Sequence, residues 1–300
     1  MEIEILGVPM DLGSSRRGTD MGPSAIRYAR LTEALRQIGH TVRDTGNLEV
    51  PVAESLDMDH PRLKHIEAIE PTWRRLAERV ARTAAAGRAP LVLGGDHSLA
   101  VGTVAGLLDA GWDDLGLLWF DAHADFNDSE TTPSGNVHGM PVSCIVGQAA
   151  PELLAYTRWM RRYLPADRIV MIGLRDVDPG ERQRLRASGI AVYTMQQIDE
   201  MGIAEVTRRA LEHLRTRGAR RLYVSFDMDV VDPDVAPGVG TPVVGGLTYR
   251  ESHLAMEIVA ESGLLAGMEV VEVNPIRDVL NRTAELAVAL IASAFGKRIL

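Results

Sequence analysis

Short apolar segments alternate with longer amphipathic segments along almost all of this 300-residue chain, and this alternation is the feature that most constrains its fold. Nearly continuous apolar strands separated by helices are typical of a parallel sheet that is buried on both faces. The expected strands are Ile3–Val8, His40–Thr45, Leu91–Leu93, Leu115–Phe120, Ile169–Ile172, Ala191–Tyr193, Leu222–Phe226 and Met268–Val273. The expected helices include Ser24–Ile38, Ile66–Ala86, Ala204–Thr216, Tyr249–Glu261 and Thr283–Phe295.

The sequence contains no linker, repeat or low-complexity run, so we predict one domain over residues 1–300. Strand count and alternation do not distinguish an eight-stranded barrel from an open three-layer sheet. In both folds, functional side chains lie at the C-terminal ends of the strands. The residues that follow the apolar segments are therefore the first place to look for a site.

Composition excludes several classes of protein. The net charge of −9 and the pI near 5.4 argue against a nucleic-acid partner, whose phosphates select basic surfaces. The single cysteine, Cys144, excludes an internal disulfide and a thiolate metal cluster. The N-terminus lacks the basic start and apolar run of a signal peptide, and the longest apolar stretch, near 286–295, is short for a membrane span. We expect a cytoplasmic protein without a membrane partner.

Three polar clusters each follow an apolar strand directly. The second of them, Asp121-Ala-His123-Ala-Asp125, places an acid or histidine at every second residue, and Asp227 and Asp229 repeat this spacing in the third. In an extended chain, alternate side chains point to the same side. The first cluster, Gly94-Gly95-Asp96-His97, adds a second imidazole. At the carboxyl edge of a parallel sheet, all of these side chains would meet.

Four carboxylates gathered at one edge would repel one another and would be costly to desolvate without cations. Two divalent ions would neutralise them, and an oxygen-rich set with two imidazoles suits manganese better than a thiolate-seeking metal. A pair of ions can bring the pKa of a bound water from 15.7 toward about 7. Each cluster alone also has a structural interpretation, since Asp caps helices and His97 follows a tight turn. Signatures of other enzyme classes are absent: we find no phosphate loop, no nucleophile elbow and no His-Glu-X-X-His motif.

Taken together, the Gly-Gly-Asp-His, Asp-Ala-His-Ala-Asp and Ser-Phe-Asp-Met-Asp segments resemble the ureohydrolase family, which includes arginases and agmatinases. The similarity spans Gly7–Gly13 through Glu272–Pro275. It implies an open three-layer α/β/α fold with an eight-stranded parallel sheet, and two Mn²⁺ ions per subunit. By the same resemblance, one ion binds His97, Asp121, Asp125 and Asp227, and the other binds His123, Asp121, Asp227 and Asp229.

Other segments resemble the arginase branch of the family. The resemblance assigns the substrate's α-carboxylate to Asn127, Ser134 and Asn136, its α-amino group to Asp178, and its guanidinium end to Thr241 and Glu272. Ser134 and Asn136 could equally form an ordinary turn, Asp178 could cap a helix before Pro179, Thr241 could lie in a plain turn, and Glu272 could be a solvated charge at a strand end. His138 matches a histidine that transfers protons, with a structural loop histidine as the alternative.

The resemblance thus implies hydrolysis of the small molecule L-arginine to L-ornithine and urea. In this reaction a hydroxide bridging the metals attacks the guanidinium carbon, Glu272 orients the substrate, and Asp125 and His138 move protons. It also implies a homo-oligomer, either a trimer or a hexamer. Two alternatives remain. A sibling enzyme acting on agmatine or a related guanidino compound would share the six ligands, and a non-catalytic metal-binding protein would need neither Glu272 nor His138. A related deacetylase with a single zinc ion is disfavoured because both metal sets are intact.

Overall fold

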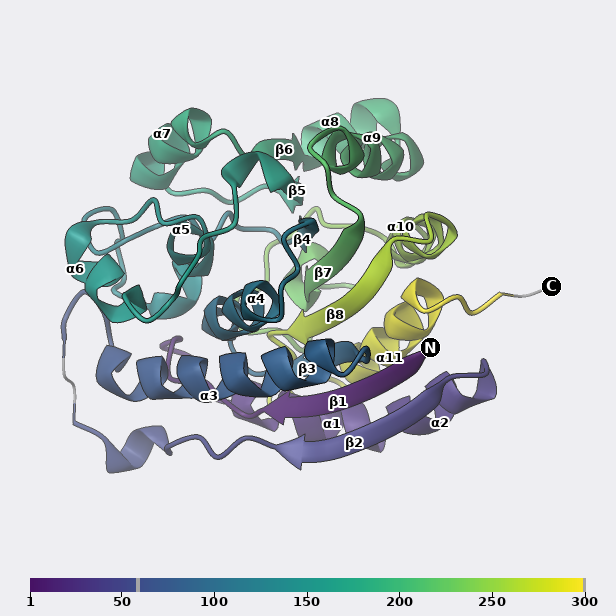
Figure 1. Ribbon diagram of the computed structural model, residues 1–300, viewed down its shortest axis with the longest axis horizontal. Coiled ribbons are helices and arrows are strands. Elements are labelled where there is room, and N and C mark those ends of the chain that lie inside the picture. Colours follow the sequence, from purple (N-terminus) through teal and green to yellow (C-terminus); the bar gives the residue numbers. More distant parts are fainter. Residues whose placement is uncertain (58–59, 299–300) are drawn as a thin grey trace.

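In a computed structural model that describes residues 1–57 and 60–298, the chain forms a central sheet covered by helices on both faces (Figure 1). The sheet has eight parallel strands in the order β2-β1-β3-β8-β7-β4-β5-β6, so it is open rather than closed into a barrel. The expected three-layer α/β/α fold is confirmed. The strands are β1 (Glu2–Val8), β2 (Thr41–Asn47), β3 (Ala89–Gly94), β4 (Leu115–Phe120), β5 (Ile169–Leu174), β6 (Ala191–Thr194), β7 (Arg221–Asp227) and β8 (Leu265–Val271).

The helices divide between the two faces of the sheet. One face carries α1 (Gly22–Tyr28), α2 (Leu31–Gln37), α8 (Met195–Met201), α9 (Ile203–Thr216), α10 (Tyr249–Glu261) and α11 (Arg282–Ala294), whose apolar residues share one core cluster. The other face carries α3 (Ile66–Ala85), α4 (Ala100–Asp109), α5 (Pro141–Ile145), α6 (Pro151–Leu154) and α7 (Pro179–Ser188). This division is the reason that the strands are apolar on both sides.

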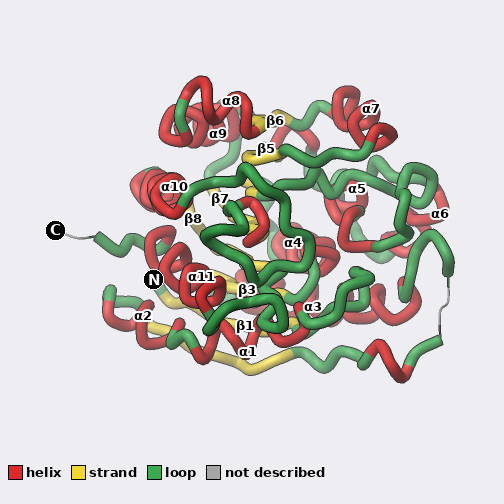
Figure 2. The backbone as a smooth tube through the Cα atoms, turned by 180° about the vertical axis from the view of Figure 1, so that it is seen from behind, coloured by secondary structure: helices red, strands yellow, loops and turns green. Residues whose placement is uncertain are grey.

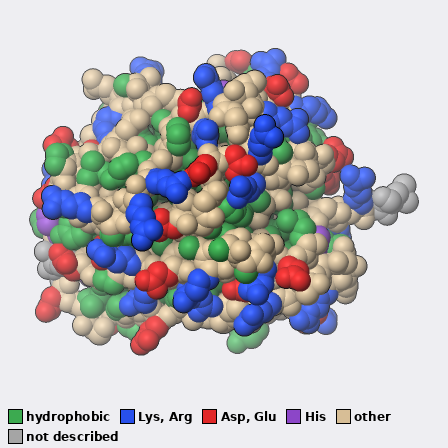
Figure 3. Space-filling view, viewed as in Figure 1, with side chains coloured by type: hydrophobic (Ala, Val, Ile, Leu, Met, Phe, Trp, Pro, Cys, Tyr) green, Lys and Arg blue, Asp and Glu red, His purple; other side chains and the backbone are tan. Residues whose placement is uncertain are grey.

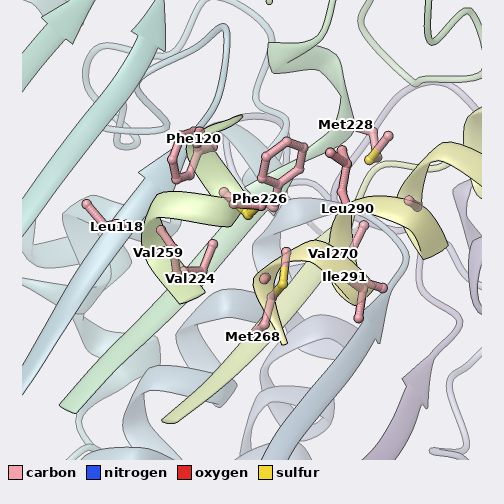
Figure 4. Packing of buried hydrophobic residues seen from close by; sticks show 14 of the residues in the cluster. Leu118, Phe120, Val224, Phe226, Met228, Val259, Met268, Val270, Leu290 and Ile291 are labelled. Atoms are coloured by element: carbon pink, nitrogen blue, oxygen red, sulfur yellow. The ribbon is translucent and has the colours of Figure 1, made fainter. Parts of the chain in front are cut away.

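Successive strand residues feed the two cores alternately. In β4, Leu118 and Phe120 belong to the first core, whereas Leu117 and Trp119 belong to the second. Figure 4 shows the first core, in which side chains of β4, β7 and β8 pack against Val259 of α10 and against Leu290 and Ile291 of α11. The central strands are held from both faces, and their carboxyl ends are fixed accordingly.

Most expected boundaries differ from the structure by one to three residues, and two differences have a clear backbone cause. The helix expected over Ser24–Ile38 is two helices, α1 and α2, because Arg30 between them adopts a left-handed conformation with φ of 67°. The last strand begins at Leu265 and ends at Val271, where Glu272 leaves the extended conformation with φ of 64°. Residues 58–59 and 299–300 of the predicted domain lie outside the described residues.

One face of the molecule is mixed in charge. Figure 3 shows Lys and Arg side chains interspersed with Asp and Glu over one face of the molecule. Within the described residues, the helices include none with the length and apolar character that crossing a membrane requires.

Figure 2 shows that long loops lie in front of the central strands when the molecule is seen from behind. The loops that follow β3, β4, β5 and β7 carry the residues described next.

Candidate metal centre and adjoining cavity

The three polar clusters meet at the carboxyl edge of the sheet. β3, β4 and β7 all run in the same direction, and β7 pairs with both β4 and β8. Their ends therefore bring His97, Asp121 and Asp227 together, although these residues lie far apart in the sequence. Two groups of side chains could hold a metal ion: His97, Asp121 and Asp125 form one, and Asp121, His123 and Asp229 form the other. Asp121 belongs to both groups.

His97 is the centre of the first group. Its Nδ1 lies 3.1 Å from Asp121 Oδ2, 3.2 Å from Asp125 Oδ2 and 3.2 Å from Asp227 Oδ2, and the imidazole is 1% exposed. In the metal-free protein, burial opposes protonation, but the three carboxylates raise the pKa of His97 well above its usual value. A proton at Nδ1 thus occupies a place where a divalent cation would satisfy the same oxygens.

The other nitrogen of His97 shows which atom faces the carboxylates. Ser225 Oγ lies 2.8 Å from His97 Nε2 and donates its own hydrogen to Glu269 Oε1 at 2.8 Å. Since the serine hydrogen is used on Glu269, Nε2–H must be the donor in the first contact. That leaves Nδ1 as the buried atom that faces the three acids, and once its proton is lost it presents a lone pair to them. A buried lone pair facing three acids fits a metal ion.

The second group is more open. His123 Nδ1 lies 3.1 Å from Asp229 Oδ2 and 3.4 Å from Asp121 Oδ1, and the His123 side chain is 26% exposed. The two oxygens of Asp121 therefore face different histidines, an arrangement that suits a bridging carboxylate. The contact of Asp227 Oδ2 with His97 Nδ1 joins Asp227 to the first group.

The pKa values report the crowding of acids. Burial and the charge of Asp121 raise the pKa of Asp125 to about 6. Burial and the charges of Asp229 and Asp121 raise the pKa of Asp227 well above its usual value. Burial acts in the same direction on Asp121, but hydrogen bonds to His123 and His97 lower its pKa. The site thus holds more acidic groups than its two histidines can neutralise. Two divalent cations would relieve the resulting repulsion.

The backbone supports the site with unusual conformations. Asp125 has φ of 49° and Glu272 has φ of 64°, both in the left-handed region that residues with a Cβ rarely adopt. Each such residue costs on the order of 1–3 kcal/mol, and such residues concentrate at functional sites.

A cavity of about 150 Å³ opens beside the metal ligands. His123, Asp125 and Asp227 reach it from the ligand side. The residues predicted to bind substrate or to transfer protons that line it are Asn127, Ser134, Asn136, His138, Asp178 and Thr241. The structure therefore brings together residues from the three segments that follow β4, β5 and β7, which the sequence spreads over more than a hundred positions.

Several structural interpretations of these residues hold as well. Asp178 is the N-cap of α7, where its N–H donates to Glu181 Oε2 at 3.2 Å, and its side chain accepts from Asn127 Nδ2 at 3.0 Å. Ser134 and Asn136 form a turn in which Asn136 N–H donates to Ser134 Oγ. Thr241 donates to Asp229 Oδ2 at 3.1 Å. A role in the fold and a place on the cavity wall thus coincide.

Glu272 lies behind the wall rather than on it. It is 1% exposed, so it is not the solvated strand-end charge that was the alternative. Its Oε1 accepts from the His97 backbone N–H at 3.0 Å and lies 2.9 Å from His138 Nδ1, while its Oε2 is buried without a partner. Burial opposes protonation of His138, but the charge of Glu272 and the hydrogen bond to it raise the pKa of His138 to about 9.

Sequence reasoning missed some of the site. Glu181 and Asp176 also line the cavity, and Glu181 Oε1 accepts from Phe126 N–H at 2.7 Å, which ties α7 to the loop after β4. Ser225 and Glu269 lie behind His97. Signals for the latter two were present, because Ser225 keeps the period-two spacing of Asp227 and Asp229, and Glu269 is an acid inside a buried strand.

The fold and this cluster define a three-layer α/β protein with a candidate two-metal centre at the carboxyl edge of its sheet. Comparison with known proteins gives the family. The model of the arginase family matches residues 1–296, so the chain belongs to the arginase family. It is accordingly an enzyme of the hydrolase class.

Individual relatives agree with this assignment. The chain is 46% identical over 299 residues to arginase from Bacillus caldovelox and 45% identical over 298 residues to arginase from Bacillus subtilis strain 168, with 99% of each chain covered. The native structure of the Bacillus caldovelox arginase superposes with a TM-score of 0.94 at 45% identity, covering 99% of both chains. The similarity extends over the whole fold and is not confined to the site.

Proposed function

We propose that this protein is a dimanganese arginase that hydrolyses L-arginine to L-ornithine and urea, and that residues 1–300 form one domain. The observation that carries the proposal is the convergence of six predicted metal ligands beside a cavity, whose wall carries three of these ligands and five predicted substrate residues. The names of the relatives, all arginases at more than 40% identity, support the same reaction.

We assign His97, Asp121, Asp125 and Asp227 to one ion, and His123, Asp121, Asp227 and Asp229 to the other. Five oxygen or nitrogen ligands lie within the two groups, and Asp227 is in contact with the first. Oxygen-rich sets with imidazole favour manganese. When bound, the two ions supply a water that loses a proton near neutral pH.

The cavity wall orients the substrate. Carboxylates of Asp125, Asp176, Asp178, Glu181 and Asp227 line it, so a cationic substrate is attracted. The side chains of Asn127, Ser134 and Asn136 offer neutral donors for an α-carboxylate, and Asp178 offers an acceptor for an α-amino group. Glu272 lies behind His138 rather than on the wall, and we assign its Oε2, which is buried without a hydrogen-bond partner, to a guanidinium N–H of the bound substrate.

Hydrolysis breaks the bond between the guanidinium carbon and the nitrogen of the side chain, and the oxygen of water ends on that carbon as the urea carbonyl. Both protons of the water end on the departing amine, which leaves as an ammonium group. Asp125 lies on the cavity wall beside His97 and relays one of these protons. His138, held by Glu272, exchanges protons between the amine and solvent.

Parallel assays of urea release from arginine and agmatine test the proposal. Agmatine lacks the α-carboxylate, so donors in the site stay unmatched, and we expect arginine to be preferred by about 10²-fold or more in kcat/KM. Chelation should abolish turnover, and manganese should restore it. Full activity of a verified metal-free preparation would contradict the metal assignment. Comparable turnover of both substrates would favour an agmatinase.

The variants Ser134→Ala and Asp178→Ala refine the test. Ser134→Ala should reduce the preference for arginine, since its hydroxyl is assigned to the carboxylate that agmatine lacks. Asp178→Ala should weaken the binding of both substrates, because agmatine keeps the amino group assigned to Asp178. An unchanged ratio of the two kcat/KM values in Ser134→Ala would remove Ser134 from the specificity site, and unchanged KM values for both substrates in Asp178→Ala would remove Asp178 from the substrate site, while leaving the reaction in place.

A further inference from the structure

Lys64 is one of only two lysines among the 32 basic residues of the chain, and it contacts Asn136 of the cavity wall. Its ammonium group donates to Ser15 Oγ at 3.1 Å and to Asn136 Oδ1 at 3.2 Å. Its backbone N–H donates to the carbonyl of Gly135 at 3.0 Å. The segment that precedes α3 is therefore tied to the turn that carries Ser134 and Asn136.

The packing of this turn is close. A Cβ at Gly135 would lie 2.4 Å from the carbonyl oxygen of Pro61, and Gly135 has φ of 75°, so glycine is required there on both counts. Lys64 consequently has little freedom to move relative to Asn136. Its side chain is only partly exposed.

Lys64 and Ser15 together determine which end of the Asn136 amide faces the cavity. Asn136 Oδ1 accepts from Ser15 Oγ at 2.7 Å as well as from Lys64 Nζ, so both lone pairs of this oxygen are used. A cationic donor on the oxygen excludes the flipped amide, which would place NH₂ against NH₃⁺. The two N–H donors of the Asn136 side-chain amide are left for a ligand in the cavity.

The charge of Lys64 matters because of its surroundings. The acids that line the cavity attract a guanidinium group but repel a free carboxylate. Lys64 places a positive charge at the end of the cavity that carries Ser134 and Asn136, opposite in sign to that acidic lining. An ammonium group has three N–H donors, of which these contacts use two.

We propose that Lys64 is a specificity-determining residue that selects substrates with an α-carboxylate, by fixing the Asn136 amide and by supplying a positive charge at that end of the cavity. The inference rests on the proposed function. It adds a residue outside the motifs from which that function was assigned.

The test compares Lys64→Met with Lys297→Met, which removes the same charge from the exposed C-terminal end. For Lys64→Met we expect KM for arginine to rise about tenfold to a hundredfold with kcat nearly unchanged, as loss of a charge-assisted hydrogen bond predicts. Agmatine should be turned over as well as before or better. Lys64→Gln, which keeps a donor but no charge, should fall between, and Lys297→Met should match the parent.

Calorimetric binding of ornithine and putrescine makes the result independent of turnover, because these diamines differ only in the carboxylate. Lys64→Met should weaken ornithine binding and spare putrescine, even if arginine proves not to be the substrate. An unchanged affinity for ornithine, or an equal loss for both diamines, would overturn the inference. An equal loss for both diamines would show that Lys64 only holds the loop in place, and the Tm of Lys64→Met should then be lower than that of the parent. Absence of arginine turnover by the parent, with the ornithine effect intact, would instead contradict the proposed function alone.

Discussion

The candidate metal centre consists of the group around His97 (the His97 half) and the group around His123 (the His123 half). The two halves use the same residue types but differ in their surroundings. His97 is buried, stacks on Trp119 with ring centroids 4.0 Å apart, and is held from behind by Ser225 and Glu269. His123 lies on the cavity wall, and its side chain is 26% exposed. One half is fixed before any ion binds, whereas the other remains open to water and substrate.

The difference has an energetic consequence. A histidine whose second nitrogen is fixed by a hydrogen bond is oriented and made more basic for a metal. An ion at the His97 half should accordingly be held more tightly than its neighbour, and the neighbour should exchange first during dialysis. Four experiments can break or sharpen this comparison.

The largest effect should come from Asp121→Asn, because Asp121 faces both halves. We expect activity to fall by at least about 10⁴-fold, the upper end for loss of one acid–base group, since the change weakens both ions at once. The metal content, measured by atomic absorption, and the rate of urea release test this prediction. Asp109→Asn, at an exposed position on α4, is the control and should behave as the parent. Normal metal content in Asp121→Asn would remove the bridging role.

The next largest effect should come from His138→Asn, which faces the same cavity as His123 but is tied to the His97 half through Glu272. We expect kcat to fall by about 10²–10⁴-fold while metal content is unchanged. His60 forms a similar pair with Glu152 away from the cavity, so His60→Asn is a matched control that should keep full activity. Loss of metal from His138→Asn would mean that the histidine supports the centre and does not transfer protons.

A smaller effect, on the affinity for each metal ion, should distinguish the two halves directly. Ser225→Ala and Thr241→Val each remove one hydroxyl, the first behind His97 and the second beside Asp229. We expect Ser225→Ala to weaken the tighter ion by about 10–100-fold, and Thr241→Val to act only on the looser ion and by less. Stepwise manganese titration by calorimetry resolves the two. Equal effects of both variants on a single binding step would end the distinction between the halves.

The smallest effect concerns stability of the metal-free protein. Glu272 raises the pKa of His138 to about 9, against 6.5 for a free imidazole. Because the folded pKa is raised, the pair stabilises the fold fully below about pH 6.5 and loses this contribution as the pH rises through 9. The Tm difference between parent and His138→Asn should be a few degrees at pH 6 and should shrink toward pH 9.5. A difference that is constant with pH would mean that Glu272 and His138 do not form an ion pair.

Much of the fold follows from local patterns. All eight expected strands occur, because each is an apolar run too short for a helix and is followed by polar residues. The break at Arg30 was missed since nothing in the composition of Ser24–Ile38 opposes a continuous helix. The order of the strands was beyond local reasoning, because pairing depends on contacts between distant segments. An open sheet was expected only from the family resemblance.

The site was predicted unevenly for a similar reason. The polar residues after β4 were evident from the sequence, but the extended conformation assumed for Asp121, His123 and Asp125 does not occur, because β4 ends at Phe120 and Asp125 is left-handed. Asp121 contributes to both metal groups, whereas Asp125 and His123 contribute to different ones. Glu272 illustrates the limit, since its place after a strand was evident while its position behind His138 depends on a left-handed backbone conformation. Lys64 carried no motif at all. Its relation to Asn136 arises from the packing of two loops that are 72 positions apart.

The position of β8 determines when the molecule can be completed during synthesis. This last strand to be made lies between β3 and β7, near the middle of the sheet. A nascent chain that has emerged only to residue 264 has β2-β1-β3 on one side and β7-β4-β5-β6 on the other, with no strand to join them. His97 belongs to the first part, whereas Asp121 and Asp227 belong to the second. The ribosome must therefore release nearly the whole chain before His97 can meet the other ligands. A protein shortened by its last forty residues would keep Asp121, His123 and Asp229 in one part of the sheet and would lack the group around His97.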